Sequence, residues 1–218
     1  MADQPPARNF REAVKWFRAR VPITKEKWIE MGEAAQAKGF TIAGVAQLEL
    51  VADVFKDLVK SLEKGEALDD FKKRVSAKLE TAWGEDRPWH VENIFRTNLQ
   101  RAYSHARHEQ MSQPAVLRDR PFWRYSATID QRTTEICRRI HGTVLPADDP
   151  WWRTHIPPLH FKCRGAKMAL TREQAEALGI AAAAPNVDAM EGFGLLDEWE
   201  PDLSAMPAPL VKTYRRGQ

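Results

Sequence analysis

Two pairs of cysteine and histidine residues constrain the fold of this chain more than any other feature. They follow the pattern C-x3-H-x18-H-x2-C, with Cys137 and His141 in the first pair and His160 and Cys163 in the second. The first spacing places two side chains one helical turn apart, and the second fits a tight turn. Thiolate and imidazole are typical ligands of structural zinc sites, which take four protein ligands. The sequence therefore predicts a structural Zn²⁺ ion that brings the two pairs together.

The segment between the two pairs supports this prediction. Residues 146–160 hold four prolines and the pair Trp151-Trp152, a composition that predicts a long loop. Long loops within compact domains are usually functional or held in place by another group. A metal ion would explain how this loop is held with so little regular structure around it.

The residues alone leave the ligand set and the chemistry open. Asp130 is an alternative fourth ligand to His141, or it orients a ligating histidine from outside the first coordination sphere. Without a metal, Cys137 and Cys163 are either buried thiols or a disulfide pair. A cysteine with His160 and Asp130 also has the residue types of a nucleophile, a base and an orienting group. No known nucleophile motif surrounds these residues, so the sequence favours a non-catalytic site.

Apolar residues at helical spacing predict that residues 1–112 are mainly helical. The predicted helices span residues 10–20, 25–37, 42–64, 68–83 and 88–111. Thr24 is the expected N-cap of the second helix, and Thr41 is expected to begin the third. The third helix has apolar residues three and four positions apart, which is typical of a helix packed on other helices. Its apolar positions are Leu48, Val51, Phe55, Leu58 and Leu62.

After Pro114 the pattern changes to short strands and helices, which predicts a compact domain over residues 113–180. Strands are expected at 122–128, 143–145 and 167–170. Asp130 is the expected cap of a short helix ending near Ile140, and Thr171 with Gln174 forms a capping box. The aromatic pairs of this region are expected to fill its core, with base stacking as the alternative.

The last part of the chain, residues 181–218, has no clear periodicity. Its prolines alternate with acidic and isolated large apolar residues. We expect an extended arm that lies on this protein or on a neighbour, with a disordered tail as the alternative. Together these regions predict an α+β fold, with a mainly helical N-terminal half, a small mixed α/β domain and a C-terminal arm.

The charges are unevenly distributed, although the net charge is only +3. Residues 87–139 carry 10 basic and 5 acidic side chains, whereas residues 173–218 carry 3 and 8. The basic region includes Arg96, Arg101 and Arg107 on the helix predicted at 88–111, a candidate surface for the phosphates of DNA. A solvated basic face, neutralised by the acidic tail, is the alternative. The sequence shows neither a secretory signal nor an apolar segment of membrane-spanning length, so we expect no membrane partner.

A set of motifs in the second half resembles the signature of the phage Mu F-like minor head proteins, the head morphogenesis family of tailed phages. The resemblance covers roughly residues 10–180 and lies mainly in D-x-R-T followed by P-P-x-H-x-x-C-R. His141 lies outside the usual pattern. The positions that match the signature are Asp130, Arg132, Thr133, Cys137, Gly142, His160, Cys163 and Arg164.

This resemblance implies a structural role in head assembly rather than catalysis. The implied protein is a minor capsid component of a tailed phage or prophage, which joins the prohead near the portal. Its expected partners are the portal, the major capsid protein, further copies of itself and packaged DNA, first in the host cytoplasm and then in the virion head. Two other functions remain open: a DNA-binding head protein and a metal-dependent hydrolase or nuclease.

Overall fold

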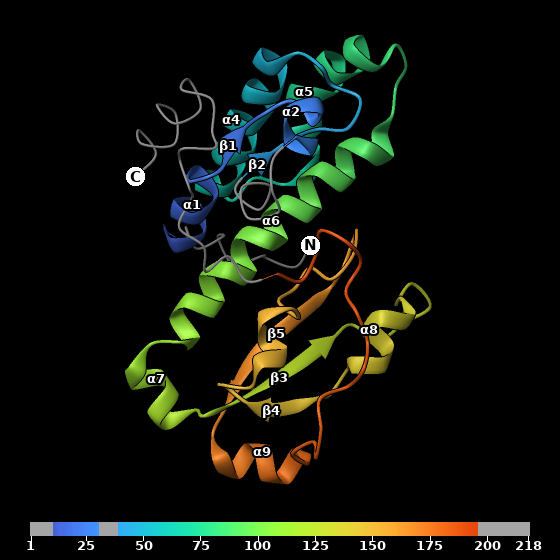
Figure 1. Ribbon diagram of the computed structural model, residues 1–218. Helices are drawn as coiled ribbons and strands as arrows, with labels where there is room; N and C mark the ends of the chain where they lie inside the picture. The colour runs from blue at the N-terminus through green and yellow to red at the C-terminus, as the bar shows by residue number, and fades with distance from the viewer. Residues whose placement is uncertain (1–10, 31–38, 196–218) are drawn as a thin grey trace, which may run out of the picture. The chain divides into compact units, whose positions relative to one another are not determined.

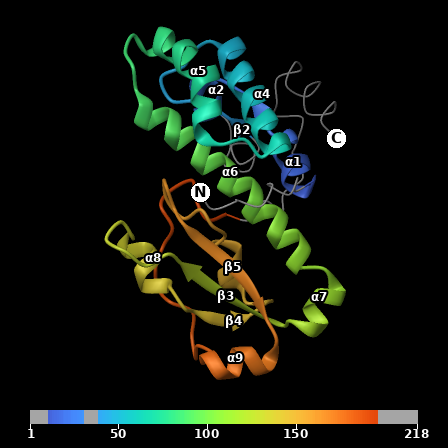
Figure 2. The same ribbon diagram turned by 180° about the vertical axis from the view of Figure 1, so that it is seen from behind.

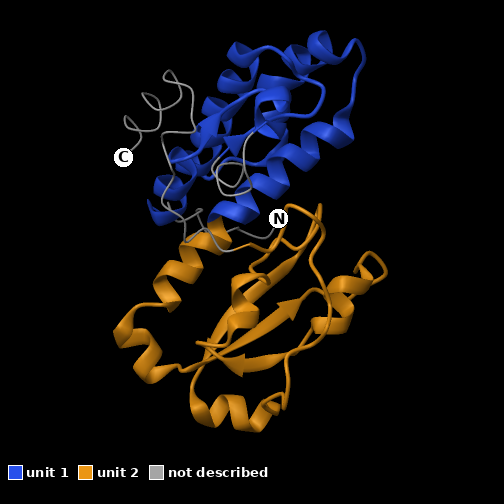
Figure 3. Ribbon diagram, in the orientation of Figure 1, with its two compact units in different colours: residues 1–102, 197–218 blue, residues 103–196 orange. Residues whose placement is uncertain are grey.

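The computed structural model describes residues 11–30 and 39–195, which form two compact units (Figure 3). Residues 1–102 with 197–218 are assigned to unit 1, and residues 103–196 to unit 2. Helices dominate the described part of unit 1, and unit 2 contains a three-stranded sheet. This arrangement confirms the predicted α+β class.

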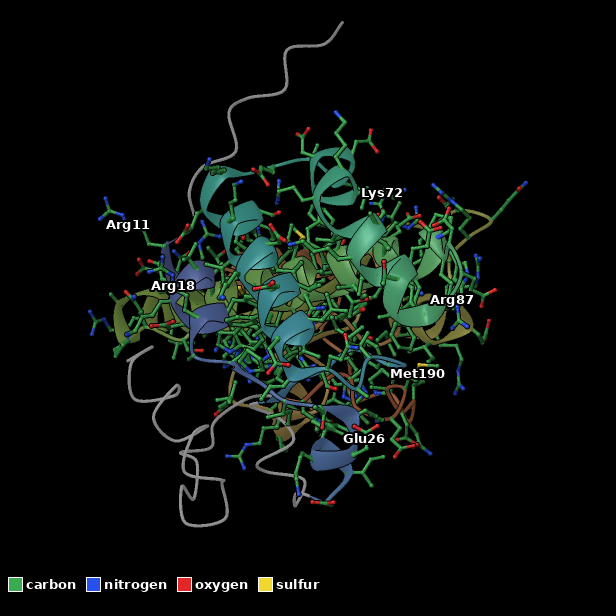
Figure 4. All side chains as sticks on the ribbon, turned by 90° about the horizontal axis from the view of Figure 1, so that it is seen from above. Arg11, Arg18, Glu26, Lys72, Arg87 and Met190 are labelled. Atoms are coloured by element: carbon green, nitrogen blue, oxygen red, sulfur yellow. The ribbon has the colours of Figure 1, made fainter. Side chains whose placement is uncertain are left out.

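Unit 1 is built mainly from helices connected by short segments (Figure 1). It also contains two short parallel strands, β1 and β2, which the sequence did not predict. In chain order its elements are α1 (Arg11–Arg18), β1 (Val21–Pro22), α2 (Lys25–Ile29), β2 (Gly39–Phe40), α4 (Leu48–Lys64), α5 (Leu68–Trp83) and the first part of α6 (Pro88–Met111). Charged side chains such as Arg11 and Glu26 are exposed and point away from their helices (Figure 4).

The core of unit 1 follows the apolar spacing of its helices. On α4, Val51, Leu58 and Leu62 are buried as the sequence predicts, whereas Leu48 at the first position is exposed. The ring of Phe55 stacks on that of Phe17 from α1, with centroids 5.1 Å apart. The stacked rings join α1 to α4, and they add to the apolar burial of this unit.

The helix predicted over 42–64 begins later, at Leu48, so this boundary and the role of Thr41 are corrected. Residues 41–47 form a loop instead, with a turn at residues 43 and 44 and with Ile42 and Val45 buried. Gly44 has a φ of +75°, a left-handed conformation that a right-handed helix excludes. Helix α2 ends at Ile29, and the remainder of the helix predicted to residue 37 lies mostly outside the described residues.

Unit 2 is centred on a small antiparallel sheet with the order β4-β3-β5, which is visible from both sides (Figures 1 and 2). Strand β3 pairs along its whole length with β5, from Phe122 opposite Leu170 to Ala127 opposite Gly165. After the end of α6, its elements are α7 (Pro114–Asp119), β3 (Phe122–Ala127), α8 (Glu135–Ile140), β4 (Val144–Pro146), the 3-10 helix η1 (Pro150–Arg153), β5 (Gly165–Leu170) and α9 (Arg172–Leu178).

Aromatic side chains fill the core of unit 2, in agreement with the sequence. Trp123, Trp151 and Trp152 are buried. Two of them also donate to backbone carbonyls. Nε1 of Trp152 donates to Pro146 O in the long loop at 2.9 Å, and Nε1 of Trp151 donates to Pro185 O in the segment after α9 at 3.2 Å. Trp151 and Trp152 therefore attach the long loop to the core and to the segment after α9. The burial of both aromatic pairs leaves little ring surface for stacking on bases.

The segment that follows α9 lies on unit 2 up to the last described residue. Ala181 N donates to Val144 O, and Met190 N donates to Leu159 O, each at 2.9 Å. Val187 is buried in the core of the unit. The first part of the predicted arm therefore packs on its own domain, and residues 196–218 lie outside the described residues.

The lengths and apolar character of the described helices can be compared with those of membrane-spanning helices. Within residues 11–30 and 39–195, none combines the length and the apolar character needed to cross a bilayer.

Candidate metal centre

Cys137, His160 and Cys163 meet inside unit 2, where all three are buried. Their candidate ligand atoms lie within 4.8 Å of one another. Sγ of Cys137 is 3.7 Å from Sγ of Cys163 and 3.1 Å from Nε2 of His160. Three of the five predicted ligands therefore form one cluster.

The first half of the cluster is positioned by the start of α8. Thr134 is the N-cap of this helix, and its hydroxyl accepts a hydrogen bond from Cys137 N at 3.5 Å. This cap replaces Asp130, which the sequence predicted, so the helix begins at Glu135. Cys137 consequently lies in the first turn of α8, with its side chain directed into the core of the unit.

The second half of the cluster is a tight turn between the long loop and β5. Cys163 N donates to His160 O at 3.3 Å, and Lys162 between them has a left-handed φ of 56°. Gly165 N donates to Sγ of Cys163 at 3.3 Å. The turn thus provides one ligand at each end, as the spacing of His160 and Cys163 predicts.

Tyr125, in the middle of β3, completes the buried side of the cluster. Its hydroxyl lies 3.3 Å from Sγ of Cys137 and 3.7 Å from Sγ of Cys163. The space beside it exists because residue 165 is glycine. A Cβ at position 165 would lie 2.1 Å from the Tyr125 hydroxyl. The sequence did not indicate Tyr125, Thr134 or Gly165 as part of the site. Of these, Thr134 is the residue that its spacing before α8 could have indicated.

A backbone contact fixes the orientation of His160. Its Nδ1 lies 2.7 Å from Phe161 O, an acceptor that requires a proton on Nδ1. In the neutral ring Nε2 is then unprotonated and faces Cys137 Sγ and the Thr134 hydroxyl, which is 2.8 Å away. Histidines that bind metals are commonly oriented by such a contact on their other nitrogen.

The two thiols have unequal acidities because they interact directly. The hydrogen bond from Cys137 lowers the pKa of Cys163 to about 4, and the same contact raises the pKa of Cys137. The contact with Cys163 also raises the pKa of His160. Burial raises the pKa of Tyr125, so its hydroxyl keeps its proton and can donate it to sulfur. The cluster therefore holds one thiolate readily.

His141 and Asp130, the other two predicted ligands, lie outside this cluster. Nδ1 of His141 accepts a hydrogen bond from Ala127 N at 3.0 Å, which joins the end of α8 to the end of β3. Asp130 binds Arg164 through both carboxylate oxygens and accepts a hydrogen bond from Arg132 N at 2.8 Å. Each of these two side chains thus has a structural partner of its own.

The geometry also bears on the disulfide and the catalytic alternatives. Both cysteines are free, and their sulfur atoms are 3.7 Å apart, far longer than a disulfide bond of about 2.05 Å. Asp130 is bound to Arg164, and the Nδ1 atom of His160 faces a backbone carbonyl. Asp130 therefore does not orient His160, as a catalytic base would require.

A small pocket opens beside the cluster. Cys137, His160 and Thr134 lie along its wall. Three basic residues, Arg132, Lys162 and Arg164, line it as well, and none of the residues described as lining it carries a carboxylate. Asp130 neutralises Arg164, so the positive charge beside the accessible side of the cluster comes from Arg132 and Lys162.

The three arginines predicted to contact DNA all lie on α6. Arg96 pairs with Glu92 at 2.6 Å, and Nη1 of Arg107 donates to Lys167 O at 3.4 Å. Arg101 also makes contacts within the protein. These contacts do not test DNA binding, which stays a prediction.

The sequence matches the family described as "Phage Mu protein F like protein" over residues 52–168. It is 27% identical over 187 residues to the "Putative capsid assembly protein F" of Escherichia phage Mu, covering 78% of this chain and 42% of that protein. It is also 29% identical over 166 residues to the "Mu-like prophage FluMu F protein" of Haemophilus influenzae, covering 70% of this chain and 40% of that protein. No solved structure matches it.

These comparisons agree with the resemblance found in the sequence. The chain spans less than half the length of either curated relative. The matched residues include the whole segment from Asp130 to Cys163 that forms the cluster, and they make up more than half of the chain. The chain belongs to the Phage Mu protein F like family.

Proposed function

We propose that this protein is a minor structural component of a tailed-phage or prophage head, which joins the prohead near the portal. One observation carries the proposal: the family match covers residues 52–168, and the phage Mu relative is named as a capsid assembly protein. The protein would assemble in the host cytoplasm and stay in the virion head, in contact with the portal, the major capsid protein or further copies of itself.

The geometry of the cluster supports a structural role over a catalytic one. Its side chains are buried and bind one another, and Asp130 is bound to Arg164. The lining of the adjacent pocket, as far as the described residues define it, offers no carboxylate to act as a general base. The cluster would therefore hold the fold of unit 2 while other surfaces bind virion proteins.

Incorporation into heads tests this proposal. The phage or prophage that encodes the chain would be grown with this gene intact, deleted, or complemented with an epitope-tagged copy. We expect the tagged protein in purified proheads and mature heads at a low, constant number of copies, and a lower yield of filled heads from the deletion. Absence of the protein from both particles, with normal head yield from the deletion, would overturn the proposal.

A binding experiment separates the DNA-binding alternative from the structural role. Titration of the purified protein with duplex DNA at low and high salt measures the number of phosphate contacts, because such binding weakens steeply with salt. A structural protein that reaches proheads before DNA is packaged requires no such binding. Incorporation only into DNA-filled heads, with strongly salt-dependent binding, would favour the DNA-binding function instead.

A further inference from the structure

We infer that Cys137, His160 and Cys163 bind one zinc ion, whose fourth coordination position opens into the pocket lined by Arg132, Lys162 and Arg164. The inference rests on the geometry of unit 2 and is independent of the role proposed in head assembly. It differs from the closed four-ligand site that the sequence predicted, because His141 and Asp130 have other partners.

Two of the three distances within the cluster are known individually, and both are close to those around a tetrahedral ion. Two sulfur ligands bonded to zinc at about 2.3 Å lie about 3.8 Å apart when the angle between them is tetrahedral. The observed separation of the two sulfur atoms is 3.7 Å. The separation of 3.1 Å between Cys137 Sγ and His160 Nε2 is a few tenths of an ångström shorter than a tetrahedral ion requires. A small movement of the His160 ring would make room for the ion.

The groups around the three ligands are arranged for metal binding. Phe161 O fixes the tautomer of His160 that presents Nε2 to the ion. The Gly165 amide and the Tyr125 hydroxyl donate toward sulfur, and such donors stabilise thiolates. These outer contacts exist in the structure and would not need to form when the ion binds.

The ligand set selects the class of metal. Two thiolates and an imidazole in tetrahedral positions suit zinc, whereas calcium and magnesium prefer oxygen ligands. The charge also favours occupancy, because two thiolates neutralise a divalent ion within a buried site.

The fourth position lies on the side of the pocket. Tyr125 lies against the two sulfurs and is not part of the pocket lining, whereas Thr134 and His160 both belong to it. A water molecule or an anion could therefore reach the ion beside the Thr134 hydroxyl. Arg132 and Lys162 would favour an anionic ligand there, whereas the charge of Arg164 is already neutralised by Asp130.

Metal analysis of the full chain tests the site. The protein would be expressed in zinc-supplemented medium, purified under reducing conditions without chelator, and measured for zinc by elemental analysis. The expected content is about one ion per chain. The metal would then be removed and replaced by Co²⁺, which in a tetrahedral thiolate site gives strong visible bands and a sulfur-to-metal charge-transfer band. Folded, reduced protein that binds neither ion would overturn the inference.

Variants identify the ligands. Cys137→Ser, Cys163→Ser and His160→Ala should each lose zinc, whereas His160→Cys should keep the ion and increase the charge-transfer band of cobalt. His141→Gln is the matched control, because this histidine lies in the same unit outside the cluster, and it should keep the full zinc content. Loss of zinc in His141→Gln, together with retention in His160→Ala, would overturn the ligand assignment.

Added azide tests the open position on the cobalt-substituted protein. An accessible fourth site should exchange its water for azide and shift the visible bands, and Arg132→Gln should weaken this exchange without changing the metal content. Cobalt bands that do not respond to azide would overturn the open position, because they would indicate a fourth ligand from the protein.

Discussion

Arg164 binds both carboxylate oxygens of Asp130 through its two terminal nitrogens, at 2.7 and 2.6 Å. These residues are 34 positions apart, and each lies close in sequence to one half of the cluster. Asp130 begins the turn that leads to α8 and Cys137, and Arg164 directly follows Cys163. The paired hydrogen bonds from Arg164 hold the pKa of Asp130 well below its usual range. The pair therefore joins the two ends of the family signature without contributing a ligand.

Asp130→Asn tests this role. The substitution removes the charge that binds Arg164, so we expect a modest fall in Tm, of a few degrees or less, because the pair is partly exposed. Zinc content should stay unchanged, because Asp130 is not a ligand. Metal analysis and thermal unfolding of the same sample measure both properties.

Arg164→Lys provides the complementary variant, because lysine cannot bind both carboxylate oxygens in the same way. It should lower Tm to a similar extent, and the double variant should be no worse than either single change. An additive loss would show that the two residues act separately, and loss of zinc in Asp130→Asn alone would identify Asp130 as a ligand.

Gly165→Ala should destabilise unit 2 through a direct clash. The added methyl group would lie 2.1 Å from the Tyr125 hydroxyl, so the ring must move within a buried region. Overpacking of this kind costs about 1–3 kcal/mol. Urea unfolding should show the loss, and adding Tyr125→Phe should recover part of it, because the nearest clashing atom is removed. Equal stability of Gly165→Ala and the wild type would contradict the geometry.

Local patterns in the sequence predicted much of the fold. Helix α6 runs from Pro88 to Met111 as predicted, because its start has a favourable proline and its apolar spacing is regular. The capping box of Thr171 and Gln174 is present at the start of α9. Both features depend on residues within one or two helical turns, which a single sequence records directly.

The features that were missed depend on contacts between distant residues or on backbone angles. The position of Tyr125 between the sulfurs results from the pairing of β3 with β5, and nothing near Tyr125 in the sequence indicates it. The positive φ of Gly44 excludes this residue from the predicted helix, and the presence of a glycine does not by itself reveal its angle. Asp130 and Thr134 are both good helix caps, so only the structure could show which one begins α8.

His108 should make the stability of unit 2 depend on pH. Its Nδ1 contacts Nζ of Lys167, and burial lowers the pKa of His108 from 6.5 to about 3, with a further effect from the charge of Lys167. Between these values the unfolded chain binds a proton that the folded protein does not. Stability should therefore fall as the pH drops below 6.5, by up to about 1.4 kcal/mol per pH unit.

His108→Gln is the matched variant for this effect, because glutamine keeps an acceptor for Lys167 but does not titrate. Urea unfolding of both proteins between pH 7 and pH 5 should show a steeper loss for the wild type. Comparison at each pH removes the contribution of all other groups. Parallel curves for the two proteins would show that His108 titrates normally in the folded state.

Arg74 should be the most important charged residue for the stability of unit 1. It binds Asp57 at 2.8 Å and Glu66 at 2.6 Å, and it also donates to the Ser61 hydroxyl at 3.0 Å. The side chains of both acids are about 15% exposed, so water screens these contacts poorly. Arg74→Met would leave two largely buried carboxylates without this partner, at a cost of about 2–3 kcal/mol.

The exposed pair of Lys56 and Asp53 offers a matched control for this substitution. Their side chains are 76% and 51% exposed, so Lys56→Met should change the free energy of unfolding by less than about 0.5 kcal/mol. The two variants are matched, because Lys56 and Arg74 are both replaced by methionine and both lie on helices of unit 1. Urea unfolding followed by helical circular dichroism compares them directly. A similar loss of unfolding free energy in the two variants would contradict this prediction. It would show that solvent screens the contacts of Arg74 as fully as those of an exposed ion pair.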